Sequence, residues 1–287
     1  MSPIPKGLRK KFSPQSSSFD EGWLKKTLNK SLGFTMKAKP GVFHASSLGE
    51  DARVLLWRFL GIFEEEISAQ QARKMGRGTA IHTAWAKDLQ NAGVLVVAEK
   101  PVNEEPIHGR LDFIVRPPAG TGEPQIREVF LLELKSQGPF PFSKTFTPDY
   151  RALCQWTFYS YKENIPKGYI IYESMDTQDT KYFYCVRENK DVYVYLNQVV
   201  IAEWPNLVND IFEKTYYVTW CASHNALPDK CAGCIQGCRY PKICEEQVKT
   251  RKLVTLDEWR LLNQKPVQSN LVSSVDGKEI NNAEVDS

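Results

Sequence analysis

The spacing of apolar residues predicts two helices early in the chain. Segment 46–51 combines serines with acidic residues, as at a capped helix start, and an apolar stripe follows over residues 54–60. From Ser68 to about Asn91, apolar residues recur at steps of three and four, which predicts an amphipathic helix. His82 lies on or beside the apolar face of this second helix.

After this point the period changes to that of strands. Short β-branched segments, separated by turn-rich sequence, cover residues 94–102, 109–115, 129–135, 168–173, 182–187 and 192–195. Helices are expected at 151–162 and 198–212, with Pro205 bending or interrupting the second one. The alternation predicts an α/β fold with a central mixed β-sheet flanked by helices.

Composition divides the chain into four parts. Residues 1–40, rich in Ser, Lys and Pro, are expected to form a flexible basic arm, and 41–220 the core. Residues 221–261 are rich in cysteine, and 262–287 have no periodicity and are expected to be disordered. The net charge of +3 indicates no polyanionic partner by itself, so the basic arm either contacts phosphates or only aids solubility. Its basic residues are Lys6, Arg9, Lys10, Lys11, Lys25, Lys26 and Lys30.

No apolar run reaches the roughly eighteen residues of a membrane span. The basic N-terminus has no apolar segment behind it and is not a secretory signal. We therefore expect no membrane association and a cytoplasmic location, or the host cytoplasm if the protein is viral.

Charged residues interrupt two of the predicted strands. The apolar strand 129–135 contains Glu133 and Lys135, and the two-residue period of a strand directs both to one face. The preceding strand carries Asp112 among apolar residues, where a buried carboxylate needs a cation or polar partner. Carboxylates bind hard cations such as Mg²⁺ or Mn²⁺, which polarise phosphate, and a nearby lysine can orient water or stabilise an oxyanion. This combination suits phosphodiester hydrolysis.

Two further features accompany the acids: His82 on the upstream helix, and Gln155 and Tyr159 four residues apart on the helix after the Glu-x-Lys strand. In this order the set resembles the RecB-type branch of the PD-(D/E)xK nuclease superfamily. The resemblance covers roughly residues 44–245 and implies a restriction-endonuclease-like core.

The resemblance also implies roles for individual residues. His82, Asp112, Glu133 and the Leu134 carbonyl would bind Mg²⁺ or Mn²⁺, and Lys135 would be the catalytic lysine. Gln155 and Tyr159 would position DNA or that lysine. The expected activity is a metal-dependent DNA exonuclease in recombination, repair, replication or phage DNA processing. The alternative is a non-catalytic or end-trimming DNA-binding subunit of a recombination or CRISPR-adaptation complex.

Five of the seven cysteines lie close together. Cys231, Cys234, Cys238 and Cys244 provide four thiols within fourteen residues, a spacing typical of a metal site. The segment resembles the [4Fe–4S] region of CRISPR-associated RecB-like and AddB-type nucleases. However, Asp51 stands where those families have an N-terminal cysteine, for which Cys221 would be a possible replacement. A structural Zn²⁺ site fits the same residues, whereas Cys154 and Cys185 are isolated and expected in the core. 

The segment after the Glu-x-Lys strand, residues 138–146, alternates aromatic residues with a lysine. It could stack unpaired bases or pack on the sheet. The resemblance favours single-stranded DNA or frayed ends as substrate. Recombination or replication proteins are possible partners, and nothing indicates the oligomeric state or the polarity of cleavage.

Overall fold

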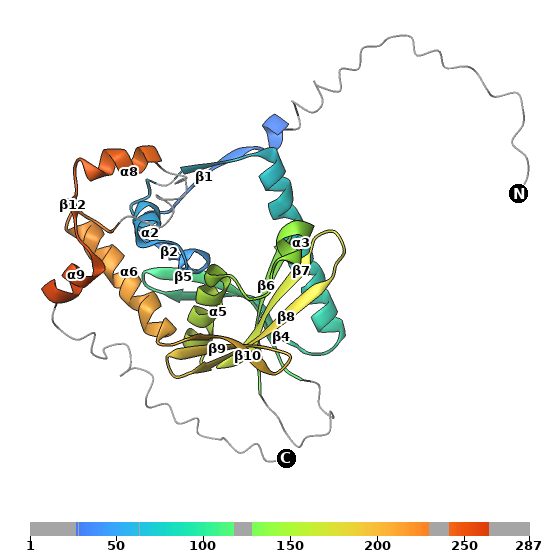
Figure 1. Ribbon diagram of the computed structural model, residues 1–287. Helices are drawn as coiled ribbons and strands as arrows, with labels where there is room; N and C mark the ends of the chain where they lie inside the picture. Colours follow the sequence, from blue (N-terminus) through green and yellow to red (C-terminus); the bar gives the residue numbers. More distant parts are fainter. Residues whose placement is uncertain (1–26, 28, 63, 118–127, 230–240, 264–287) are drawn as a thin grey trace, which may run out of the picture.

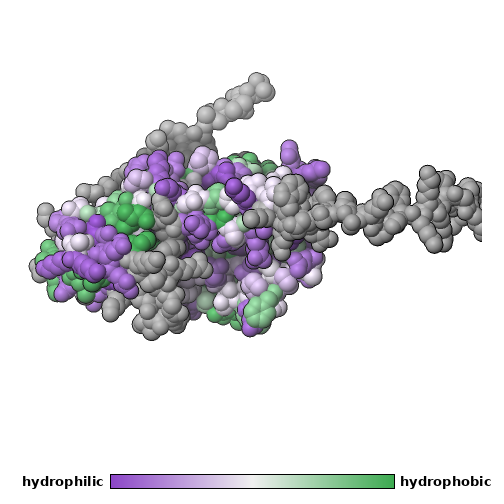
Figure 2. Space-filling view, turned by 90° about the horizontal axis from the view of Figure 1, so that it is seen from above, coloured by the Kyte–Doolittle hydropathy of each residue, from purple (hydrophilic) through white to green (hydrophobic). Residues whose placement is uncertain are grey.

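The computed structural model describes residues 27, 29–62, 64–117, 128–229 and 241–263. It contains one large mixed β-sheet with helices on both faces (Figure 1). The predicted α/β class with a central mixed sheet flanked by helices is thereby confirmed. In the described part of the chain, no helix is both long and apolar enough to span a membrane. Hydrophilic and hydrophobic side chains interleave over the coloured part of the face in Figure 2.

The large sheet has eight strands in the order β10-β9-β8-β7-β6-β5-β2, and β4 also pairs with β5. Its strands are β2 (Phe43–His44), β4 (Leu95–Glu104), β5 (Ile107–Val115), β6 (Phe130–Gln137), β7 (Lys167–Ser174), β8 (Thr180–Glu188), β9 (Asp191–Leu196) and β10 (Val199–Trp204). The pairs β6–β7 and β2–β5 are parallel, and the other pairs are antiparallel.

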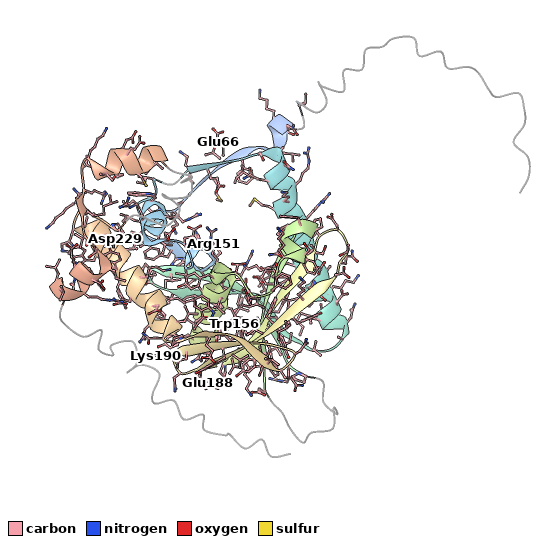
Figure 3. All side chains as sticks on the ribbon, in the orientation of Figure 1. Glu66, Arg151, Trp156, Glu188, Lys190 and Asp229 are labelled. Carbon is pink, nitrogen blue, oxygen red and sulfur yellow. The ribbon has the colours of Figure 1, made fainter. Side chains whose placement is uncertain are left out.

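Different helices pack against the apolar residues on the two faces of the sheet. The helices are η1 (Ala45–Ser47), α2 (Ala52–Phe59), α3 (Ala69–Asn91), α4 (Pro139–Ser143), α5 (Tyr150–Lys162), α6 (Leu207–Ser223), α8 (Pro241–Val248) and α9 (Leu256–Leu262). Ile81, Trp85 and Leu89 of α3 pack on one face. Helices α2, α5 and α6 pack on the other, where Trp156, labelled in Figure 3, is fully buried.

Two small sheets lie outside the large one. Strand β1 (Phe34–Lys37) pairs antiparallel with β3 (Glu64–Ile67), so part of the segment expected to be a flexible arm forms a strand. Strand β11 (Ala226–Leu227) pairs parallel with β12 (Lys252–Leu253). Most of the basic arm and the 264–287 tail lie outside the described residues.

The prediction of a helix over residues 198–212 is wrong for the first part of that range. Residues 199–204 form strand β10, which pairs antiparallel with β9, and helix α6 begins only at Leu207. Asn197 and Gln198 both have positive φ, at 49° and 66°, and form the tight turn between β9 and β10. The β-branched residues 199–201 fit a strand, and Pro205 separates that strand from the helix.

The first helix also begins later than predicted. Residues 45–47 form a 3₁₀ turn, and α2 starts at Ala52 with Asp51 at its N-cap, where no side-chain cap hydrogen bond is made. The second helix, α3, spans the predicted residues. It begins after Ser68, whose side chain accepts a hydrogen bond from Gln71 N–H in a capping box.

The end of the described chain packs back on the core. The buried Arg53 of α2 donates from Nε and Nη2 to the Pro228 carbonyl, at 3.1 and 2.5 Å. On α6, Tyr217 Oη donates to the Val254 carbonyl. Residues before and after segment 230–240 are therefore both held against the helical layer.

Candidate active site

Strands β5 and β6 separate where their acidic residues lie. Their ladder contains only the pairs Phe113–Leu132, Ile114–Leu131 and Val115–Phe130. Asp112 and Glu133 come next on the two strands, beyond the last pair. Asp112 Oδ2 accepts a hydrogen bond of 2.7 Å from the Leu134 N–H across this fork. The buried carboxylate thus has the polar partner that its sequence position requires.

Glu133 and Lys135 lie on the same face of β6, as predicted. Lys135 Nζ lies 2.7 Å from Glu133 Oε1 and donates to Gln155 Oε1 of α5 at 2.8 Å. Glu133 is only 1% exposed, and its Oε2 has no hydrogen-bond partner. A buried, ionised carboxylate oxygen without a partner is costly unless the group is protonated or a cation is bound there.

Helix α5 positions Lys135 and also anchors β5. Tyr159 Oη donates to the Arg110 carbonyl and accepts from the Arg110 N–H, both at 3.0 Å, and Gln155 Nε2 lies 3.4 Å from Tyr159 Oη. Gly109 makes this approach possible, since a Cβ there would lie 2.6 Å from Tyr159 Oη. Gln155 thus contacts the lysine, and Tyr159 contacts the backbone of the strand.

His82 reaches the same site from α3. Its Nδ1 lies 3.5 Å from Asp112 Oδ1, and its ring packs beside Phe113. Gly78, one turn earlier, faces Ser136, and a Cβ there would lie 3.1 Å from Ser136 Oγ. The structure therefore brings together all four residues predicted to be catalytic, from α3, β5 and β6.

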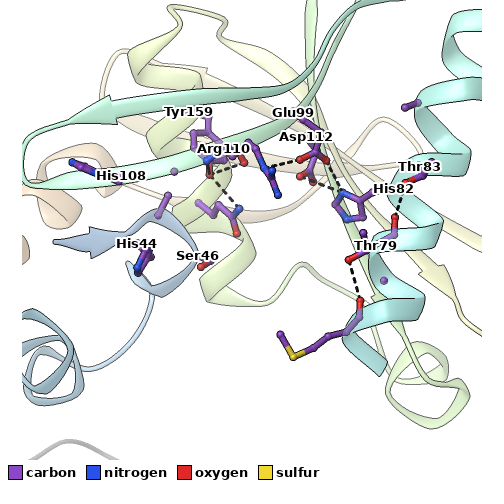
Figure 4. A pocket seen from close by; sticks show the side chains of 16 residues that line it. His44, Ser46, Thr79, His82, Thr83, Glu99, His108, Arg110, Asp112 and Tyr159 are labelled. Carbon is purple, nitrogen blue, oxygen red and sulfur yellow. Dashed lines mark hydrogen bonds and ion pairs between the residues drawn. The ribbon is translucent and has the colours of Figure 1, made fainter. Parts of the chain in front are cut away.

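Glu99 of β4 belongs to this cluster and is absent from the sequence-based set. Its Oε1 lies 3.4 Å from His82 Nδ1, and its Oε2 lies 2.6 Å from Arg110 Nε (Figure 4). One ligand atom each from His82, Glu99 and Asp112 lies within 4.8 Å of the others. Only the pairing of β4 with β5 could have indicated this residue, because it belongs to no short motif.

The two buried acids hold protons more tightly than ordinary carboxyl groups. Burial raises the pKa of Asp112 to about 7, although the Leu134 N–H and Lys135 oppose this shift. Burial, followed by the charge of Asp112, raises the pKa of Glu133 to about 8. Burial alone would lower the pKa of Lys135, but the Glu133 and Asp112 charges outweigh it, so that its pKa is raised. Lys135 is therefore an ammonium group at neutral pH.

The cluster opens into a cleft of about 890 Å³. Helix α3, η1 and the start of β5 line it, and Thr79, His82, Arg110 and Tyr159 are among the side chains that face it (Figure 4). A cleft of this size accommodates a drug-sized molecule or a few nucleotides.

The donors at the fork fit a hard divalent cation. Asp112, Glu133 and Glu99 offer carboxylate oxygens and His82 an imidazole nitrogen, a set that suits Mg²⁺ or Mn²⁺. A cation bound there would give Glu133 Oε2 the partner that it lacks. The charges of Asp112 and His82 both act on the pKa of Glu133, which places all three side chains in one electrostatic environment.

Other predicted residues lie elsewhere. Cys231, Cys234 and Cys238 lie outside the described residues, whereas Cys221 and Cys244 are buried on α6 and α8. Burial raises the pKa of Cys221 to about 12, so it is a thiol in this structure. Cys154 and Cys185 are core residues, as expected. In segment 138–146, α4 and the loop after it leave Phe140 and Phe146 exposed, outside the residues that line the cleft.

No protein-family model and no curated protein matches this sequence. A solved structure that is similar in part is the crystal structure of SSO0001, at 16% sequence identity and a TM-score of 0.38. The similarity covers 69% of this chain and 85% of that chain. A TM-score this low carries no argument about fold or function, so the function has to be inferred from the site itself.

Proposed function

We propose that this chain is a Mg²⁺- or Mn²⁺-dependent deoxyribonuclease of the RecB-type PD-(D/E)xK kind, with a restriction-endonuclease-like core. The observation that carries the proposal is the meeting of Asp112, Glu133 and Lys135 at the fork between β5 and β6. A sheet that served only for stability would have little reason to bury two acids there, since their desolvation is costly.

In this proposal Asp112, Glu133, His82 and the Leu134 carbonyl hold the cation. The cation would polarise the scissile phosphate and lower the pKa of a bound water. Lys135 is an ammonium group positioned by Glu133 and Gln155. It would orient the attacking water and stabilise the negative charge that develops on the phosphate oxygens in the transition state. Gln155 and Tyr159 keep this geometry in place.

We further propose end-directed hydrolysis of single-stranded DNA or frayed ends. That choice follows from the resemblance. The cleft supports a phosphodiester substrate more generally, because His82, Asp112 and Arg110 are among the residues that line it. A guanidinium there can contact a phosphate without reading sequence.

We also propose that the cysteine-rich segment binds a [4Fe–4S] cluster or a Zn²⁺ ion with a structural role. The packing of residues on both sides of segment 230–240 against the helical layer supports a stapling role, because metal binding energy then adds to folding energy.

The decisive experiment compares the wild type with Lys135→Ala on 5′- and 3′-labelled single strands and on the matching duplex, in Mg²⁺ and in Mn²⁺. We expect the variant to lose at least about a hundredfold in rate, because the charge that stabilises the transition state is removed. Lys162→Ala is the matched control, since Lys162 forms an ion pair with Glu104 away from the site.

Equal rates for wild type and Lys135→Ala would remove the proposed mechanism. A wild type that binds DNA without cleaving it in either metal would favour the non-catalytic subunit instead. The labelled products also report the polarity of cleavage and the preference for single strands.

A further inference from the structure

Two phenylalanines in the segment after strand β6 are exposed to solvent. Phe140 and Phe146 are 68% and 73% exposed, whereas Phe142, the third aromatic residue of segment 138–146, packs against the core. The sequence allowed this segment either to pack on the sheet or to stack unpaired bases. For Phe140 and Phe146 the exposure favours stacking, because a ring that packed on the sheet would be withdrawn from water.

Hydrogen bonds attach the segment to two strands of the large sheet. Thr145 Oγ1 donates to Gln137 Oε1 at the end of β6, at 2.8 Å. From β8, Lys181 Nζ donates to the carbonyls of Phe142 and Thr145, at 2.7 and 2.9 Å. The exposed rings are therefore carried by an ordered scaffold, and a ligand that binds them has little chain to immobilise.

An ammonium group accompanies each exposed ring. Lys144 Nζ lies 4.1 Å from the centroid of the Phe140 ring, and Lys181 Nζ lies 5.5 Å from that of Phe146. Among the residues that the structure describes, neither lysine forms an ion pair with a carboxylate. Aromatic faces next to positive charges without carboxylate partners are complementary to unpaired bases and their phosphates.

This surface adjoins the candidate active site. Gln137 stands two residues after Lys135 on β6, about 7 Å further along the strand. Between them lies Ser136, which faces Gly78 at the wall of the cleft. A nucleic-acid strand with one phosphate at the acids could therefore place neighbouring bases on the two rings.

We propose that Phe140 and Phe146, with Lys144 and Lys181 beside them, form a stacking site for the unpaired bases of single-stranded DNA. The inference deepens the proposed function and rests on it for the identity of the ligand as DNA. Stacking uses the face of a base, which is covered within a duplex but present in every base. The site would therefore select unpaired strands and accept any base sequence.

The test measures binding of a short fluorescein-labelled oligothymidylate to the full-length protein in a chelator, which prevents cleavage, by fluorescence anisotropy. Phe140→Ala and Phe146→Ala should each weaken this binding about five- to a hundredfold, the scale of one lost base stack. Phe140→Trp should retain it, because indole also stacks on bases. Binding of the duplex with oligodeoxyadenylate should be the same for wild type and all three variants.

Tyr216→Ala is the matched control. It removes an exposed aromatic ring from α6, where Tyr216 lies near Glu104 rather than at the stacking site. Its affinity for oligothymidylate should equal that of the wild type.

Lys144→Gln tests the charge separately from the rings. It should reduce the slope of the logarithm of the affinity for oligothymidylate against the logarithm of salt concentration by about 0.7, the contribution of one phosphate contact. An unchanged slope would contradict a phosphate contact by Lys144.

The inference is overturned if both alanine variants bind oligothymidylate as tightly as the wild type, or if they weaken single strand and duplex equally. A surface that serves an acidic peptide instead would give the first of these results. If the wild type nevertheless cleaves DNA in Mg²⁺ or Mn²⁺, the proposed function stands and only the stacking site is removed. Phenylalanine-dependent binding by a wild type that cleaves nothing would support the stacking site and remove the nuclease.

Discussion

Among the residues that the structure describes, Glu133 is a carboxyl group in surroundings poorly suited to its ionised form. It is buried, one of its oxygens has no partner, and Asp112 lies beyond the same fork. The raised pKa values, about 7 for Asp112 and about 8 for Glu133, result from this burial. Since carboxyl groups in unfolded chains titrate near pH 4, the folded state binds more protons over the interval between these values.

We therefore expect the metal-free protein to lose stability as the pH rises from about 4 to about 8. Because the pKa values of Asp112 and Glu133 are raised in the folded state, their contribution to stability is fully present below about pH 4. It is lost as the folded protein releases these protons between about pH 4 and 8. The slope is up to about 1.4 kcal/mol per pH unit for each proton released. Urea denaturation in the presence of a chelator would measure it.

Glu133→Gln provides the comparison, because it removes one of the two titrating acids while retaining the shape of the side chain. Its stability should depend less on pH than that of the wild type. Addition of Mg²⁺ should stabilise the wild type most at high pH, where both acids are ionised. Parallel pH profiles for the two proteins would contradict the assignment of the slope to these acids.

The contrast between Glu133 and Glu99 shows what sequence can indicate about single residues. Glu133 stands two residues from Lys135 in an apolar strand, so local spacing was sufficient to place both on one face. Glu99 joins the site only through the pairing of β4 with β5 and an unusual φ, neither of which is visible in local spacing.

At the scale of elements, one tyrosine connects helix α5 to strand β5. Tyr159 is buried, and its hydroxyl bonds to both backbone groups of Arg110. We expect Tyr159→Phe to lower the free energy of unfolding by about 1–2 kcal/mol, because the partly buried N–H and C=O of Arg110 lose their partner. The midpoint of urea denaturation would measure this effect.

Tyr161→Phe is the control for that change. Tyr161 lies on the same helix, but its ring packs edge-on against Phe212, away from β5. Equal midpoints for the two variants would mean that the hydroxyl of Tyr159 does not contribute to the attachment of α5.

Helices and strands with a clear apolar periodicity were predicted well, whereas those whose ends are set by turns were not. The long helix at 69–91 has both an apolar period and a capping box, and it agrees within a residue. The strand at 199–204 was missed, because two turns define it: the Asn197–Gln198 turn before it and the break at Pro205 and Asn206, the latter in the left-handed region, that separates it from α6. Such turns are chosen by the pairing of distant strands as much as by their own residues.

At the scale of the whole molecule, the cysteine-rich segment, residues 221–261, is attached to the core at Pro228 and at Val254, on both sides of Cys231, Cys234, Cys238 and Cys244 in the sequence. We expect protein prepared without oxygen to contain either about four iron atoms or about one zinc ion per chain. Elemental analysis and the visible absorption spectrum would distinguish these outcomes.

A double Cys231→Ser, Cys234→Ser variant should lose that metal and melt at a lower temperature, since metal binding energy contributes to folding. Cys154→Ala should retain the metal, because Cys154 lies in the main core rather than in the cysteine-rich segment. Wild-type protein with neither iron nor zinc would refute the proposed metal site.

The narrow junction between β5 and β6 has a consequence for the whole sheet. Strands β6 to β10 form one half and β5, β4 and β2 the other, and three ladder pairs with the Asp112–Leu134 hydrogen bond join them. Asp112 belongs to one half and Glu133 to the other. An ion held by both acids would tie the halves together, so that its affinity and the rigidity of the sheet are thermodynamically linked.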